Sequence, residues 1–87
     1  MKIGKVIGNL WATRKAENLK GQKFLIIKVL KEENVFKDEL IVSCDMIGAG
    51  FGDLVLITDG SSARKTFEKD NIPIDSVVVG IIDSLEF

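Results

Sequence analysis

Three glycines at alternate positions, Gly48, Gly50 and Gly52, are the residues most suggestive of chemistry, because glycine-rich loops can cradle nucleotide phosphates. A dinucleotide-binding loop has two residues between its second and third glycines and opens a helix, whereas here only Phe51 intervenes and a strand-like run follows. No Gly-Lys-Ser/Thr follows either. We interpret the run, which also contains Ala49, as a tight turn that uses positive φ or close backbone approach. Approach to a neighbouring subunit beside an axis or pore is the sharper alternative.

The second candidate is the run Gly60-Ser61-Ser62-Ala63-Arg64, which places two hydroxyls and a cation at the start of an expected helix. Such a helix terminus can bind anions. A serine nucleophile is not indicated, because the chain has no histidine to activate it and the glycine spacing of a nucleophile elbow is missing. Capping of the helix by Ser61 or Ser62 is the preferred interpretation.

The remaining reactive side chains also favour structural roles. Cys44 lies in an apolar run and is expected to be a buried thiol. The aspartates fall at expected strand ends and turns, without the alternating spacing of a calcium loop: Asp45, Asp53, Asp59, Asp75 and Asp83. Trp11 and the phenylalanines, among them Phe24, Phe51 and Phe67, are expected in the core. We therefore predict no catalytic residue, no cofactor and no metal site.

Composition limits the function further. The 87 residues predict one domain, residues 1–87, which can bury roughly 60–65% of its unfolded surface. Because 46% of the residues are hydrophobic, we expect surplus apolar surface and hence an oligomer. Twelve basic and 13 acidic residues give a net charge of -1, which argues against nucleic-acid binding. No apolar run approaches the length of a membrane span, and no secretory signal opens the chain. A single cysteine fits a cytoplasmic location.

The elements that must position these residues are mostly strands. Five runs have the β-branched and aliphatic content and the length of strands; they are residues 3–13, 23–30, 40–45, 53–58 and 76–83. A short helix is expected within residues 61–70, and residues 31–39 are expected to form a hairpin tip. The pattern predicts an all-β fold, a small five-stranded OB-like Greek-key barrel with one short helix. Several strands are apolar on both faces, so the second face should meet the barrel interior or a neighbouring subunit.

In five segments the chain resembles the shell vertex proteins of bacterial microcompartments, the ethanolamine-utilisation and carboxysome vertex family. The segments are Met1-Lys2-Ile3-Gly4-Lys5-Val6-Ile7-Gly8 with Leu10-Trp11-Ala12-Thr13, Gly21-Gln22-Lys23-Phe24-Leu25-Ile26, Asp45 to Asp53 with Val55-Leu56, Gly60 to Arg64, and Pro73-Ile74-Asp75 with Val78-Val79-Gly80-Ile81-Ile82-Asp83. The resemblance covers about 80 residues in order.

The resemblance implies an OB-like barrel that assembles into a homopentamer and caps the vertices of a cytoplasmic shell whose facets are hexameric proteins. The family offers no catalytic residues to carry over, so no catalysis is expected. Neither a nucleic-acid nor a membrane partner is expected, because of the charge balance and the lack of a long apolar run. The loop Gly48, Ala49, Gly50, Phe51, Gly52 and Asp53 is then expected near the fivefold axis. The subunit contact is expected at Arg64, Val78, Val79, Gly80, Ile81 and Ile82. A homohexamer stays open, because both rings close through one repeated contact.

Two other classes of function are weighed against this one. An OB-like module for single-stranded nucleic acid, an oligosaccharide or a small ligand would fit the fold, but the acidic charge balance and scattered aromatics oppose it. A small carboxylate enzyme is opposed by the absence of histidine. The best helix candidate also precedes the last strand, whereas an OB-fold usually has its helix between strands three and four, and this leaves the barrel topology open.

Overall fold

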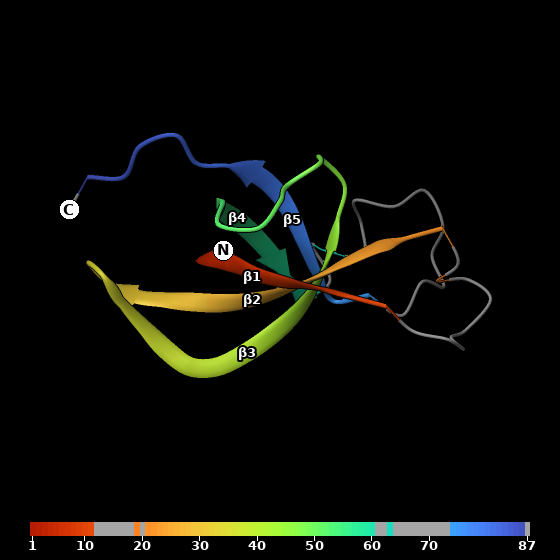
Figure 1. The fold of residues 1–87 in the computed structure, drawn as a ribbon, viewed down its shortest axis with the longest axis horizontal. Helices are drawn as coiled ribbons and strands as arrows, with labels where there is room; N and C mark the ends of the chain where they lie inside the picture. Colours follow the sequence, from red (N-terminus) through yellow and green to blue (C-terminus); the bar gives the residue numbers. More distant parts are fainter. Residues whose placement is uncertain (12–18, 20, 61–62, 64–73, 87) are drawn as a thin grey trace.

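The computed structural model describes residues 1–11, 19, 21–60, 63 and 74–86. Its strands are β1 (Lys2–Leu10), β2 (Lys23–Glu32), β3 (Val35–Asp45), β4 (Leu54–Asp59) and β5 (Ser76–Ile81). The all-β class predicted from the sequence is therefore confirmed (Figure 1). The short helix predicted within residues 61–70 falls, apart from Ala63, outside the described residues. Within the described part of the chain, no helix is long and apolar enough to cross a membrane.

The five strands form one closed barrel in the order β1-β2-β3-β5-β4, in which β4 pairs back with β1. All neighbours are antiparallel except β3 and β5, which run parallel and pair Cys44 with Val77 and Asp45 with Val78. This order settles the topology left open above. Strands β3 and β4 follow each other in the chain but are not neighbours in the barrel, because β5 lies between them. The OB-like Greek-key barrel is confirmed.

Alternating residues of the strands fill the barrel, as a half-buried strand requires. The main core cluster contains Val6, Leu25, Ile27, Ala49, Val55, Ile57 and Val78. A second cluster near the β3–β5 pairing contains Cys44, Ala63, Ile74 and Val77, with Leu19, Phe24 and Val79 packed against it. Cys44 has no exposed surface, which confirms the buried thiol.

The hairpin between β2 and β3 is longer than predicted. The sequence suggested a charged tip over residues 31–39, but β2 continues to Glu32 and β3 resumes at Val35. The turn is reduced to two residues, of which Asn34 has φ 56°. Leu30 pairs with Phe36 and Glu32 with Val35, with register shifts on either side of Leu30. Cross-strand pairing thus extends into a segment whose charges had suggested a loop.

Two aromatic side chains predicted to be in the core are on the surface. Trp11 is 89% exposed and Phe51 is 79% exposed, whereas Phe24 is partly buried as expected. Phe67 lies outside the described residues. The first strand ends at Leu10, before Trp11. The alternation of inward and outward side chains along a strand therefore does not determine where the indole points.

Candidate functional site

The glycine loop between β3 and β4 is braced at its start by the last residue of β3. One carboxylate oxygen of Asp45, Oδ1, accepts hydrogen bonds from the backbone N–H groups of Ile47 (3.1 Å) and Gly48 (3.2 Å). This is the local turn bonding that aspartate favours after a strand. It fixes the direction in which the chain leaves the barrel.

The far end of the loop is fastened to β1 and to itself. The N–H of Gly52 donates to the carbonyl of Val6 (2.9 Å), and the N–H of Val6 donates to the carbonyl of Asp53 (3.0 Å). Gly50 donates to Oδ2 of Asp53 (2.8 Å), while the Asp53 N–H donates back to the Gly50 carbonyl (3.1 Å). These bonds make the loop an extension of the barrel rim, so its tip is held in a fixed position.

Lys23 fastens the middle of the loop to β2. Its Nζ donates to the carbonyl of Ala49 (3.1 Å) and forms an ion pair with Oδ2 of Asp45 (3.4 Å). The Asp45 side chain is only 1% exposed, and its Oδ2 has no hydrogen-bond partner apart from this ion pair among the described residues. The lysine therefore compensates a buried carboxylate, which is costly to leave alone.

The three glycines of the loop differ in what they do. Gly48 and Gly52 both have φ +87°, in the left-handed region that favours glycine. Gly50 has no positive φ, and a Cβ there would come no closer than 4.0 Å to its nearest neighbour, Oδ2 of Asp53. Between them, Ala49 is 1% exposed and packs into the main core, while Phe51 projects into solvent. The loop thus presents one aromatic side chain on a rigid base.

The closing strand contributes less surface than expected. Val78 is wholly buried in the main core and Val79 packs on the second cluster. Gly80 lies against Leu56, whose Cβ would be 3.5 Å from an added Cβ, while Ile81 is 44% exposed. The N–H of Ile82 donates to the carbonyl of Leu54 (2.8 Å). Of these five predicted interface residues, Ile81 offers the clearest free apolar surface, and Arg64 lies outside the described residues.

The groups considered for catalysis are held in structural contacts. The Cys44 thiol donates to Oε1 of Gln22 (3.4 Å), and burial, followed by the charge of Asp45, raises the pKa of Cys44. Asp59 forms a partly exposed ion pair with Lys2 (3.2 Å). Among the described residues no three His, Cys, Asp or Glu side chains gather as metal ligands. These contacts give the thiol and Asp59 structural roles, as the contacts described above do for Asp45 and Asp53.

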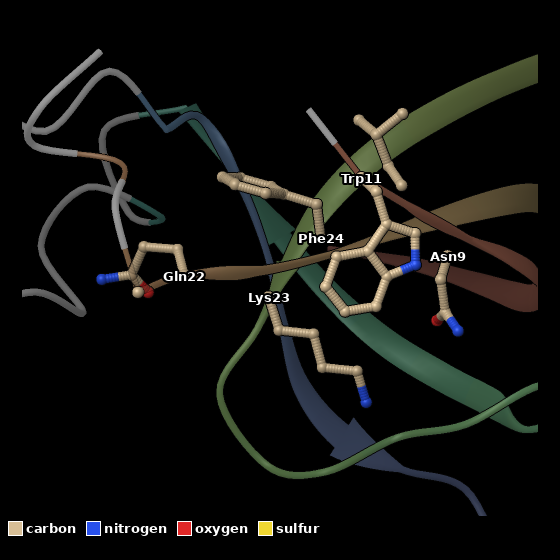
Figure 2. Close-up of a pocket in the computed structure, with 7 residues that line it drawn as sticks. Asn9, Trp11, Gln22, Lys23 and Phe24 are labelled. Atoms are coloured by element: carbon tan, nitrogen blue, oxygen red, sulfur yellow. The ribbon is translucent and has the colours of Figure 1, made fainter. Parts of the chain in front are cut away.

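An open hollow next to the braced loop was not anticipated from the sequence. It has a volume of about 370 Å³ and lies where β1 ends and β2 begins, lined by Asn9, Leu10, Trp11, Gly21, Gln22, Lys23 and Phe24. Figure 2 shows the indole of Trp11, the ring of Phe24 and the side chain of Lys23 around it. Only a slight signal in the sequence points to this hollow: Trp11 directly follows one strand, and Lys23 begins the next. The pairing of Lys23 with Asp45 is visible only in the structure.

Comparison with known proteins gives a consistent result. Residues 1–83 match the family described as "Ethanolamine utilisation protein EutN/carboxysome". The bacterial microcompartment shell vertex protein GrpN of Rhodospirillum rubrum is 43% identical over 86 residues, covering 99% of this chain and 97% of that protein. The carboxysome shell vertex protein CcmL of Thermosynechococcus vestitus is 40% identical, covering 98% and 86% of the two chains.

A solved structure, described as the GrpN pentameric microcompartment shell protein from Rhodospirillum rubrum, superimposes with a TM-score of 0.89 at 40% identity. The match covers 100% of this chain and 99% of that one. Similarity in sequence and in barrel structure thus extends over nearly the whole length of both proteins. The chain belongs to the EutN/CcmL family of ethanolamine-utilisation and carboxysome proteins.

Proposed function

We propose that this chain is a structural shell protein that forms a pentameric ring and caps the vertices of a polyhedral bacterial microcompartment in the cytoplasm. The observation that carries the proposal is the end-to-end likeness to a pentameric shell protein, at 40% identity and a TM-score of 0.89. Relatives from different compartments share the vertex description, including GrpN and CcmL. The fold therefore serves assembly, and we propose no catalytic role.

A ring of identical subunits needs two different surfaces on each chain, because every subunit contacts its neighbour head to tail. The subunit has ample material for such contacts: eleven large apolar side chains are exposed among the described residues. Single exposed apolar residues are ordinary, but this number on so small a barrel fits burial by neighbouring copies. The proposed partners are further copies of the chain and the hexameric proteins of the shell facets.

We place the loop of residues 48–53 beside the fivefold axis and the exposed end of β5 in the subunit contact. Three features support this placement. The loop is braced on both sides, so an axis lined by it would keep its shape. An added Cβ at Gly48 or Gly52 would meet nothing within 4 Å, and at Gly50 nothing closer than 4.0 Å, so the loop leaves room for a neighbouring backbone. Ile81 presents its side chain to solvent at the end of the closing strand.

Nucleic-acid binding by the OB-like barrel is not proposed. A net charge of -1 does not supply the basic surface on which such binding depends. Salt-sensitive binding of an oligonucleotide to the purified ring would argue for it nonetheless.

Native mass spectrometry of the purified chain, checked by light scattering, tests the proposal. Five copies of a 9.6 kDa chain give a species of about 48 kDa, the expected result. A ring of six would refute the fivefold geometry, and a monomer at micromolar concentration would refute ring formation. Co-expression with hexameric shell proteins tests the vertex role: closed particles should form only when this chain is present.

A further inference from the structure

Two exposed aromatic side chains contribute little to the packing of the barrel as far as the structure describes it. Trp11 and Phe51 are the most exposed aromatic residues in the described part of the chain. Both expose most of their surface, so neither covers the other within one subunit. Tryptophan and phenylalanine are enriched in protein interfaces, and tryptophan is among the residues that contribute most of the binding energy.

The surroundings of Trp11 are concave. The hollow of about 370 Å³ has Leu10 and Phe24 among its lining residues and Asn9 and Gln22 as polar ones. Interface anchors of high binding energy fill pockets of this kind, in which apolar groups surround the inserted side chain. The volume is ample for one aromatic ring.

Phe51, in contrast, is 79% exposed and lines none of the hollow. It stands on the loop that Asp45, Asp53 and Val6 hold by backbone and carboxylate hydrogen bonds. Binding through Phe51 costs little entropy of loop ordering, because the backbone of the loop is already held. Lys23 lines the hollow and also binds the carbonyl of Ala49 in the loop, so the two surfaces belong to one rigid unit.

We propose that Phe51 of one subunit inserts into the hollow beside Trp11 of the next subunit, repeating around the ring. This inference rests on the proposed ring, which requires two unlike and complementary surfaces on every chain. A projecting aromatic and an apolar hollow are such a pair. They are carried by two neighbouring segments, the β3–β4 loop and the junction of β1 with β2, which Lys23 connects.

The emission of Trp11 reports the insertion directly, because the chain has one tryptophan and no tyrosine. In assembled rings, emission should be blue-shifted relative to subunits dissociated by dilution. Phe51→Ala should abolish this shift in the rings that still form, and should raise the dissociation concentration roughly tenfold or more, as expected for an aromatic anchor. Leu40→Ala, which shortens another exposed apolar side chain (53% exposed), is the matched control and should keep the shift.

Cross-linking provides an independent measurement. In a Cys44→Ser background, cysteines introduced by Asn9→Cys and Phe51→Cys should form disulfides between subunits, giving a ladder of up to five chains on a denaturing gel. Rings of five with solvent-exposed Trp11 emission, or with cross-links confined to single chains, would overturn the insertion and leave the proposed function standing. Absence of rings in native mass spectrometry would overturn both.

Discussion

Among the glycines of the chain, Gly4 on β1 is the one where an added side chain would meet the closest contacts. A Cβ at Gly4 would overlap Cγ2 of Ile27, and it would lie 3.0 Å from the Lys28 carbonyl oxygen and 3.3 Å from Cδ1 of Ile57. Both isoleucines have no exposed surface and belong to the main core. The backbone oxygen belongs to the paired strand β2, so it cannot move without disturbing the register between Gly4 and Val29.

Gly4→Ala is therefore expected to destabilise the protein. Overpacking of a core costs about 1–3 kcal/mol, and the lower chain entropy of alanine in the unfolded state offsets about 0.4–1 kcal/mol of that. A net loss of about 1–2 kcal/mol corresponds to a fall in Tm of roughly 5–15 °C for a domain of this size.

The assay is urea unfolding followed by circular dichroism, at one fixed protein concentration because association also stabilises the folded chain. Gly8→Ala on the same strand is the matched control. Its Cβ would meet nothing closer than 3.6 Å, at Cδ1 of Ile26, and its φ is not positive. The free energy of unfolding of this control should change by less than about 0.5 kcal/mol. Equal stability of the two variants would refute the argument from close approach.

Three further predictions concern the braced loop and the buried thiol. Gly52→Ala should lower the free energy of unfolding by about 1–2 kcal/mol in thermal unfolding, because φ at this position is +87°. Gly50→Ala should leave the stability of the subunit nearly unchanged, and an equal loss of stability in the two variants would contradict this difference. Lys23→Met should lower the free energy of urea unfolding by about 1–3 kcal/mol, since it leaves the Asp45 carboxylate buried without its cation, and Asp45→Asn in the same chain should recover part of the loss. Because burial raises the pKa of Cys44, the folded thiol keeps its proton to higher pH than the unfolded one, so stability should fall as pH rises past 9.0, the ordinary value. Cys44→Ser should unfold with a smaller loss over the same range, and an identical pH profile would refute the assignment.

Much of the strand content followed from the sequence because it depends on neighbouring residues. The β-branched runs at residues 23–30, 53–58 and 76–83 lie in β2, β4 and β5 with small changes of boundary. The hairpin between β2 and β3 was underestimated, because the charges of residues 31–39 resemble those of a loop. Pairing with the opposite strand decides whether such a segment is extended, and that information is not local.

The candidate site divides in the same way. That glycines would shape the loop was predictable, since positive φ favours glycine wherever it occurs. Which of the three glycines adopt a positive φ was not predictable: Gly48 and Gly52 do, and Gly50 does not. Val78 is a similar case: its apolar strand left the barrel interior and a neighbouring subunit open, the resemblance placed it in the subunit contact, and the structure has it wholly buried in the main core.

The sequence by itself determined the all-β class, the burial of Cys44 and the scarcity of groups suited to catalysis, because these depend on composition and local pattern. The tertiary structure alone decided that β5 closes the barrel in parallel with β3, burying the hydroxyls of Ser43 and Ser76 against each other. It also decided that Lys23 compensates Asp45 and that Trp11 faces solvent. These outcomes depend on which distant segments the closed barrel brings together, and a pattern of nearest neighbours carries no information about that.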